Sequence, residues 1–154
     1  MGQGKLLVTP LQMLSLTQII ANGGVKAPLH VVKGRLEDGV FYEDSVASSK
    51  KTRLLSKETA DFIADCMRGV TATGTGKKAS PSPGAGVKTS TAETGIAVNG
   101  GTAVQSWITG FFPSNDPKYV VMVIAEETDH KVAAATPIFR EIAEAIYRFE
   151  TGWQ

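Results

Sequence analysis

The sequence has few of the residues that build disulfides and metal centres. Its one cysteine, Cys66, has no partner for an internal disulfide. Its two histidines, His30 and His130, are isolated and show neither metal-ligand spacing nor the partners of a catalytic triad. We therefore expect no metal ion and no cofactor. Because Cys66 lies in phase with neighbouring apolar residues, we expect a buried structural thiol rather than a nucleophile.

The sequence also lacks an excess of charge of one sign and any long apolar run. Sixteen Lys and Arg residues stand against fifteen Asp and Glu, which gives a net charge of +1 without a basic stripe. This balance argues against nucleic acid or a membrane surface as the partner. The longest apolar runs, such as 119–125, fall far short of the roughly 20 residues that cross a bilayer, and the N-terminus lacks the layout of a signal peptide. We expect no spanning or targeting segment and, at 154 residues, a single domain with one core.

Capping residues mark a first helix. Thr9 is a suitable N-cap, Pro10 fits the first helical position, and Gln12 completes a capping box with Thr9. The Asn-Gly-Gly that follows, at 22–24, tolerates positive φ, which is how helices commonly end. The sequence thus predicts a helix over 10–21, followed by an extended piece around 29–33 and a turn at 37–39.

A second helix fits Ser56 to about Gly69, with Ser56 as its cap. Its apolar residues share one stripe at helical spacing, which we expect to face the core: Phe62, Ile63, Cys66, Met67 and Val70. The next segment, 71–86, is rich in Gly, Pro, Ser and Thr and predicts an unusually long loop. Its "GTGKKAS" is not a phosphate-binding loop, because Thr71 and Lys78 occupy the positions where that motif requires a glycine and a hydroxyl residue.

The rest of the sequence predicts an antiparallel sheet closed by a helix. We expect strands over 87–94, 106–112 and 119–126, with turns at 98–101 and 113–118. The last helix, about 134–149, tolerates a proline only near its start. Its apolar stripe should pack on the sheet: Ile138, Ile142, Ala145, Ile146 and Phe149. Two helices, then a three-stranded meander, then a helix favour the α+β class over a doubly wound parallel sheet.

Residues 86–94, "GVKTSTAET", place one lysine among small hydroxyl residues directly after the long loop. A strand that follows such a loop often borders a cleft, where binding and catalytic residues gather. The alternative is a solvated Lys88 on an edge strand, where lysine discourages aggregation. The segment alone does not decide between them.

Several further stretches accompany this segment in a fixed order: "GQGKLLVTPLQM" (2–13) with "IANGG" (20–24), "MRGVTATGTG" (67–76), "SWITGFFPSNDPKYVVMVI" (106–124) and "AAATPIF" (133–139). Together they resemble the transpeptidase domain of class B, high-molecular-weight penicillin-binding proteins. That family carries a Lys-Thr-Gly-Thr-Ala segment, which residues 88–92 match at four of five places. The resemblance spans nearly the whole chain and implies that residues 1–154 are the C-terminal portion of such a domain, with a partial β-lactamase/transpeptidase-like α+β fold.

The resemblance implies a chemistry. In the family a serine attacks the D-Ala-D-Ala end of a peptidoglycan stem peptide, an amine from a second strand resolves the acyl-enzyme, and β-lactams trap the serine. Lys88 would then supply positive charge in the cleft, the hydroxyls of Thr89 and Thr91 would bind the substrate carboxylate, and the backbone N–H of Thr91 would donate in the oxyanion hole. The substrate would lie along the strand edge. The implied partners are the stem peptide, β-lactams and the remainder of the domain, at the extracytoplasmic face of the bacterial cell membrane.

Two features depart from the family. Ser90 stands where the family keeps glycine, and it shares its side of the strand with Lys88, so it could crowd the cleft. The family's Ser-x-x-Lys and Ser-x-Asn elements are missing, since Ser48–Lys51 fits the first only formally and lies too close to Lys88 in the chain. Three other serines are no better placed: Ser15, Ser106 and Ser114. We therefore expect the chain alone to be inactive, and we expect its exposed sheet edges to favour a homodimer.

Three alternatives stay open at this stage. The first is a β-lactam-sensing or β-lactam-hydrolysing relative on the same fold, although segment 2–13 and the hairpin at 106–124 favour the transpeptidase. The second is a noncatalytic binding or scaffolding module with a degenerate transpeptidase fold, for which Ser90 is the sign. The third is an unrelated α+β domain with a solvated Lys88.

Overall fold

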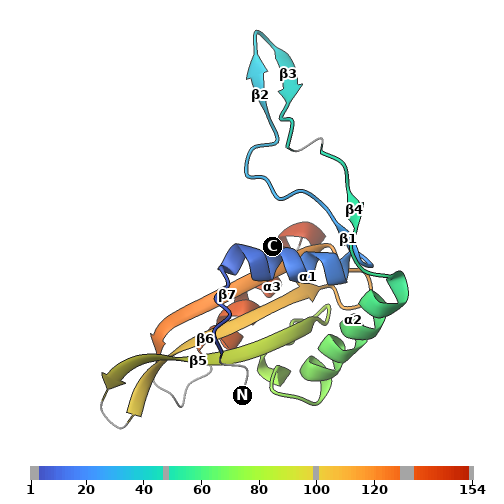
Figure 1. The fold of residues 1–154 in the computed structure, drawn as a ribbon. Helices are drawn as coiled ribbons and strands as arrows, with labels where there is room; N and C mark the ends of the chain where they lie inside the picture. Colours follow the sequence, from blue (N-terminus) through green and yellow to red (C-terminus); the bar gives the residue numbers. More distant parts are fainter. Residues whose placement is uncertain (1–3, 47–48, 99–100, 129–133, 153–154) are drawn as a thin grey trace.

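The computed structural model describes residues 4–46, 49–98, 101–128 and 134–152. The helices in these residues are α1 (Pro10–Ala21), α2 (Lys57–Ala72) and α3 (Ala135–Thr151), with a 3-10 turn, η1 (Lys77–Ala79) (Figure 1). The long strands are β5 (Gly86–Val98), β6 (Gly101–Phe112) and β7 (Tyr119–Thr128), and the short ones are β1 (Val25–Lys26), β2 (Gly34–Glu37), β3 (Val40–Glu43) and β4 (Thr52–Arg53). This arrangement confirms the predicted α+β class.

The three long strands form one antiparallel sheet in the order β5-β6-β7, which is the predicted meander. β5 and β7 are therefore its edges. In the register of β5 and β6, Lys88 lies opposite Thr109 and Val87 opposite Gly110. Glycine is required at Gly110, because an added Cβ would lie 2.6 Å from the carbonyl oxygen of Gly86 and 2.7 Å from Val87 Cγ1. Close contact at this point holds β5 tightly against β6.

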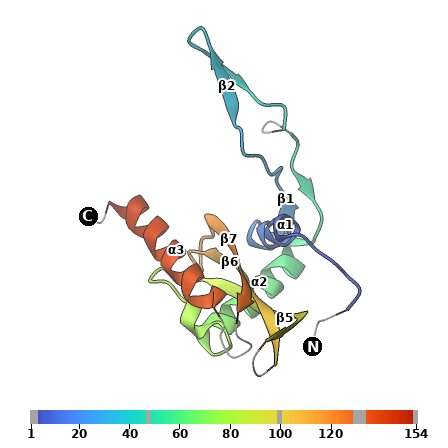
Figure 2. The same cartoon turned by 90° about the vertical axis from the view of Figure 1, so that its left-hand side faces the viewer.

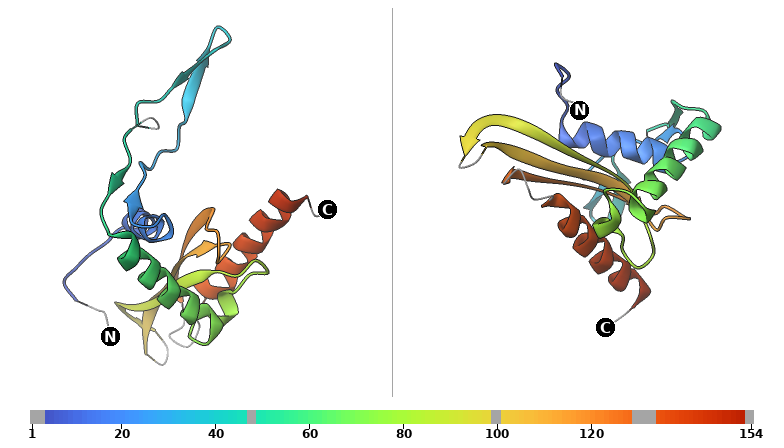
Figure 3. Two further views of the ribbon diagram at one scale, coloured as in Figure 1. Left: turned by 90° about the vertical axis from the view of Figure 1, so that its right-hand side faces the viewer. Right: turned by 90° about the horizontal axis from the view of Figure 1, so that it is seen from below.

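Helices cover both faces of the sheet. Figure 3 shows α1 on one side of the sheet and α3 on the other, and α2 crosses near the end of α1. The larger core cluster joins the sheet to α3 and the loop before β5: Ala79, Ala85, Val87, Ile108, Phe112, Val123, Ala135, Phe139 and Ala143. The smaller cluster joins the sheet to α1 and α2: Ile20, Ala64, Met67 and Phe111. The two faces of the sheet thus have separate apolar contacts.

The local capping signals set the start of each of the first two helices. In α1, the Thr9 hydroxyl accepts from the backbone N–H of Gln12 at 3.2 Å, and Gln12 Oε1 accepts from the backbone N–H of Thr9 at 2.8 Å. In α2, the Ser56 hydroxyl accepts from the backbone N–H of Thr59 at 3.1 Å. Both N-caps are confirmed, and α1 has the predicted bounds.

The predicted burial of the α2 stripe is partly wrong. Ala60, Ala64 and Met67 are buried, whereas Phe62 is 70% exposed and the Cys66 thiol is exposed rather than a buried structural group. The apolar stripe is wider than the surface that α1 and the sheet cover, so its outer edge stays open. Helical periodicity predicts which face of α2 is apolar, but it does not predict how much of that face is buried.

The stripe of α3 needs a similar correction. The buried residues of this helix are Ala135, Thr136, Phe139 and Ala143, and Ile146 packs against the same cluster. Most of the predicted stripe stays exposed: Ile138, Ile142, Ala145 and Phe149. The helix is therefore rotated about its axis from the predicted orientation, because Phe139 fits against Phe112 in an edge-to-face contact with ring centroids 6.5 Å apart. Pro137 stands in the first turn, as predicted.

A thin arm, residues 27–46 and 49–51, projects away from the body (Figures 1 and 2). It carries the hairpin of β2 and β3, whose two-residue turn is Asp38-Gly39 with φ of 50° and 79°. Asp-Gly suits such a turn because both positions need positive φ. At the base of the arm, β1 pairs with β4.

Candidate functional site

Lys88 lies on the edge strand β5 beside an apolar cavity of about 240 Å³. Helices α1 and α2 form the walls of this cavity, and its lining is Met13, Leu16, Thr17, Ile20, Ile63, Cys66, Met67, Val70, Lys88 and Thr109. The Lys88 side chain is exposed, and its ammonium donates a hydrogen bond to the carbonyl oxygen of Thr89. The cation is thus at the mouth of a concave apolar surface, on a strand with a free edge.

Two buried hydroxyl groups lie in the wall of this cavity next to Lys88. Thr109 is the cross-strand partner of Lys88, and its hydroxyl lies 2.8 Å from that of Thr17 on α1. The Thr17 hydroxyl also donates to the carbonyl oxygen of Met13 at 2.9 Å. A polar contact therefore crosses the interface of α1 and the sheet where the surroundings are otherwise apolar.

Side chains along β5 alternate between the two faces of the sheet. Lys88 and Ser90 face α1 and α2, as the cavity lining indicates for Lys88. Thr89 and Thr91 face the side of α3, since Val87 in the same phase packs in the cluster with Phe139. Lys88, Ser90 and Thr91 are exposed, and Thr89 is half-buried. All four remain reachable because the outer edge of β5 carries no strand in the described part of the chain.

The loop between α2 and β5 holds the start of the strand. Gly76 packs so closely on β5 that an added Cβ would lie 2.4 Å from Val87 Cγ2. The neighbouring Thr75 hydroxyl lies 2.8 Å from the hydroxyl of Thr89. In the last turn of α2, before this loop, the Thr71 hydroxyl donates to the carbonyl oxygen of Ala85 at 2.5 Å. The Gly-Thr-Gly segment at 74–76 thus lies against the predicted site strand.

The serines considered as nucleophiles that lie within the described residues do not line the cavity of Lys88. Ser106 is buried and accepts from the backbone N–H of Ala135 at 3.3 Å, and Ser114 lies in the turn after β6. Ser15 lines a different pocket, and Ser48 lies outside the described residues. His30 is exposed on the arm, and His130 lies outside the described residues. Of the serines in this set that the structure describes, it brings none to Lys88.

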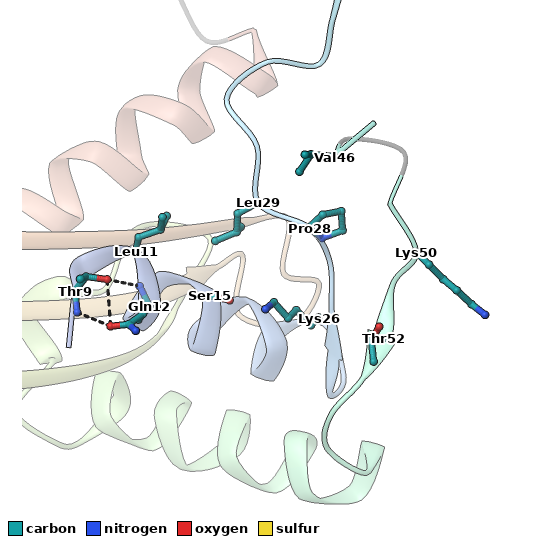
Figure 4. A pocket seen from close by; sticks show the side chains of 10 residues that line it. All are labelled: Thr9, Leu11, Gln12, Ser15, Lys26, Pro28, Leu29, Val46, Lys50 and Thr52. Carbon is teal, nitrogen blue, oxygen red and sulfur yellow. Dashed lines mark hydrogen bonds between the residues drawn. The ribbon is translucent and has the colours of Figure 1, made fainter. Parts of the chain in front are cut away.

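A second, larger hollow of about 520 Å³ separates the start of α1 from the base of the arm (Figure 4). It is lined by Thr9, Leu11, Gln12, Ser15, Lys26, Pro28, Leu29, Val46, Lys50 and Thr52. Figure 4 shows Lys50 pointing away from the rest of this lining. The side-chain amide oxygen of Gln12 accepts hydrogen bonds from the backbone N–H and the hydroxyl of Thr9, so these polar groups are already paired. Because its polar groups do not converge, this hollow is the weaker candidate for chemistry.

The described residues contain neither a metal-binding cluster nor a helix that could span a membrane. Within them, no three His, Cys, Asp or Glu side chains are grouped so as to bind a metal ion. No helix in the described ranges combines the length and the apolar character that crossing a bilayer requires.

Sequence reasoning missed three hydroxyl residues that surround the site strand: Thr17, Thr75 and Thr109. The sequence carried no signal for Thr109, because a turn that pairs position 98 with 101 would place position 88 opposite 111, and only the register shift between Glu93 and Ala97 makes Thr109 its partner. The signal for Thr75 was the Gly-Thr-Gly segment itself, since flanking glycines permit close backbone approach. Thr17 carried no local signal.

Comparison with known proteins gives the family of this chain. The family model for the penicillin binding protein transpeptidase domain matches residues 1–144. The chain is similar to a "Peptidoglycan D,D-transpeptidase FtsI homolog" of Mesostigma viride, with 28% identity over 97% of this chain and 28% of the relative. It is also similar to the crystal structure of penicillin binding protein 3 from Mycobacterium tuberculosis complexed with aztreonam, with a TM-score of 0.83, 28% identity and coverage of 97% and 37% of the two chains.

A third similarity is to penicillin-binding protein A from M. tuberculosis as an imipenem acyl-enzyme complex, with a TM-score of 0.75, 28% identity and coverage of 95% and 32%. The chain thus spans about a third or less of the length of the curated relatives it matches. Since the family model covers residues 1–144 and the fold follows solved members along nearly the whole chain, the chain belongs to the penicillin-binding protein transpeptidase domain family.

Proposed function

We propose that residues 1–154 supply the Lys-Thr wall of the active site of a peptidoglycan D,D-transpeptidase. The observation that carries this proposal is the place of Lys88: it stands on the free edge strand β5, at the mouth of the cavity between α1 and α2. A lysine with no role beyond solubility would not need to line a cavity, whereas Lys88 does. The membership of the family supports the reaction class.

In this proposal Lys88 acts through its charge. An ammonium at the mouth of an apolar cavity attracts the terminal carboxylate of a stem peptide ending in D-Ala-D-Ala and helps to organise proton transfer. The hydroxyls of Thr89 and Thr91 bind that carboxylate, and the backbone N–H of Thr91 donates to the oxyanion. Thr89 and Thr91 point to the opposite face from Lys88, but a substrate lying along the edge of β5 meets groups from both faces.

The nucleophile in this proposal comes from polypeptide outside residues 1–154. None of the serines Ser15, Ser106 and Ser114 lines the cavity of Lys88, so the chain alone is expected to form no acyl-enzyme. The open apolar edge of α2, with Phe62 and Cys66 exposed, is the surface that the remainder of the domain would cover. The complete protein would act on peptidoglycan at the extracytoplasmic face of the bacterial cell membrane and bind β-lactams.

Fluorescent penicillin tests this proposal. We expect covalent label on the longer protein that carries this chain and none on residues 1–154 by themselves. Label at a serine of residues 1–154 in the isolated chain would contradict the proposed origin of the nucleophile. The longer protein with Lys88→Met separates a catalytic lysine from a solvated one, because only loss of labelling with retained folding supports the proposed role.

One observation favours a second candidate, a noncatalytic binding or scaffolding module. Ser90 replaces the glycine of the family motif on the side of β5 that faces the cavity. A longer protein that keeps its upstream serine and stays unlabelled would support this candidate. Ser90→Gly is the matching variant: gain of labelling would show that the hydroxymethyl group blocks the cleft.

The two edges of the sheet, β5 and β7, also allow two copies of residues 1–154 to pair. We propose that the isolated chain forms a homodimer through a sheet edge. Small-angle scattering at high concentration is the test, and a strictly monomeric profile would overturn this part of the proposal.

A further inference from the structure

We propose that Thr75 is a positioning residue for carboxylate binding: with substrate bound, the Thr75 hydroxyl donates to that of Thr89, and the Thr89 hydroxyl proton is thereby aimed at the terminal carboxylate of the substrate. The inference rests on the proposed function, since it takes Thr89 as a carboxylate-binding group. It adds a residue from the loop after α2 to the site on β5.

The proposal starts from the hydrogen bond between the hydroxyls of Thr75 and Thr89. The hydroxyl oxygens of Thr75 and Thr89 lie 2.8 Å apart, a normal length for a hydrogen bond between hydroxyls. Either oxygen can be the donor. A hydroxyl has one proton and two lone pairs, so while Thr89 donates to an anion, its hydrogen bond with Thr75 persists only if Thr75 is the donor. A bound carboxylate thus selects one direction for this hydrogen bond.

The second step is the rigidity of the donor. The residues on both sides of Thr75 bond to one carbonyl group, because the backbone N–H groups of Gly74 and Gly76 both donate to Val70 at 3.1 Å. Gly76 also packs against the fully buried Val87, two residues before Thr89. The backbone around Thr75 is therefore fixed at both the helix end and the strand. The exposed Thr75 side chain thus starts from a fixed point beside Thr89, and the contact between the two hydroxyls sets its rotamer.

The third step is the effect on Thr89. A β-branched side chain has few χ1 rotamers, and the bond to Thr75 selects one of them. A hydroxyl that accepts a hydrogen bond is also a stronger donor, because neighbouring hydrogen bonds polarise one another. Both effects favour binding of a carboxylate over binding of a neutral group at the same place. Thr75 should therefore act on selectivity for the charged end of the substrate.

The test uses the longer protein that carries this chain and two acylating reporters, a D-alanyl thioester with a terminal carboxylate and its methyl ester. The measured quantity is the ratio of the acylation rate constants for the acid and the ester. Partial unfolding of a variant lowers both rate constants equally and leaves this ratio unchanged. The variants are Thr75→Val, Thr75→Ser, Thr89→Val and the double Thr75→Val/Thr89→Val.

We expect Thr75→Val to lower the acid-to-ester ratio about two- to tenfold, as loss of one neutral hydrogen bond does. Thr75→Ser keeps the hydroxyl and should stay within about twofold of the wild-type ratio. In the Thr89→Val background, Thr75→Val should add no further loss, since it acts through Thr89. The matched control is Thr73→Val in the same loop, where the hydroxyl bonds only to the carbonyl oxygen of Gly69.

The outcomes separate the two levels of the proposal. A lowered ratio in Thr89→Val with an unchanged ratio in Thr75→Val overturns the role of Thr75 and leaves the proposed function standing. Equal loss for acid and ester in Thr75→Val also overturns it, because that result shows a purely structural effect. A wild-type protein acylated by neither reporter, or an unchanged ratio in Thr89→Val, overturns the proposed function and this inference with it.

Discussion

Thr17 of α1 and Thr109 of β6 stand 92 positions apart in the sequence and share a buried hydrogen bond of 2.8 Å between their hydroxyls. Both side chains line the cavity beside Lys88. A buried hydroxyl that loses its partner keeps the cost of desolvation without the compensating bond. The pair thus ties the packing of α1 on the sheet to the shape of the proposed site.

This relationship predicts non-additive stability effects. Thr17→Val should lower the free energy of unfolding by about 1–3 kcal/mol, because Thr109 keeps only a long contact of 3.4 Å to the carbonyl oxygen of Val121. The double variant Thr17→Val/Thr109→Val should lose less than the sum of the two single variants. Urea denaturation of the four proteins measures this. Strict additivity would show that the two hydroxyls are energetically independent.

Lys88 should matter for acylation and not for folding. Its side chain is exposed, so Lys88→Met should leave the unfolding midpoint unchanged. In the longer protein the same variant should slow acylation by penicillin about 10²–10⁴-fold, as loss of a group that assists proton transfer does. The control is Lys78→Met, at an exposed lysine of η1 that does not line the cavity. Equal rates in the two variants would remove Lys88 from the chemistry.

Two glycines should respond to alanine in opposite directions. Gly110→Ala should lower the free energy of unfolding by about 1–3 kcal/mol, because the new Cβ would overlap the backbone of Gly86 and the side chain of Val87. Gly69 in α2 has open space at its Cβ position. Gly69→Ala should therefore raise the free energy of unfolding by about 0.5–1 kcal/mol through helix propensity. A stabilised Gly110→Ala would contradict the close approach of β5 and β6.

The reactivity of the Cys66 thiol measures whether the exposed side of α2 is covered. Its thiol is exposed in residues 1–154, so a maleimide should modify the native chain at nearly the rate of the urea-unfolded chain. In the longer protein we expect strong protection, because the remainder of the domain is proposed to cover this side of α2. Equal rapid modification in both proteins would place the remainder of the domain elsewhere.

The sheet and α3 should show a change in stability at high pH. Hydrogen bonding to the Glu150 carboxylate, desolvation and the charge of Glu150 all raise the pKa of Tyr119 above its ordinary value of 10.0. Because the folded pKa is above the unfolded one, the contribution of Tyr119 is complete below pH 10 and is lost as the pH rises through the folded pKa.

Absorbance titration of the tyrosines tests this assignment. Glu150→Gln should move the pKa of Tyr119 back towards its ordinary value, and Tyr119→Phe should remove the transition that responds to Glu150→Gln. An identical titration in wild type and Glu150→Gln would contradict the contact between the two side chains.

The parts of the fold that depend on local chemistry were predictable. α1 has its predicted bounds because the Thr9 and Gln12 capping box and the glycines after Ala21 act within a few residues. The strands exist where alternation predicted them, but β5 runs to Val98 rather than ending near Thr94. Its length is set by pairing with β6, and Glu93 to Ala97 includes a register shift that no local pattern reveals.

The residues of the candidate site could also be predicted only in part. The motif gave Lys88, whereas Thr109 could not be derived, because the register shift between Glu93 and Ala97 changes which residue lies opposite Lys88. The contact of Thr75 with Thr89 could not be foreseen, because it depends on how the loop after α2 turns against β5. The exposure of Cys66 was missed for a related reason: helical spacing shows that a face is apolar, whereas its burial depends on what packs there.

The arm has a consequence for how the molecule opens. Among the described residues, β2 and β3 pair only with each other, and the apolar side chains of the arm, among them Val31, Leu36 and Phe41, are turned to solvent instead of to the core. Little free energy of the body is therefore lost when β2 and β3 separate. We therefore expect the arm to unfold as a separate subglobal unit, with faster amide exchange and faster protease cleavage than the meander of β5, β6 and β7.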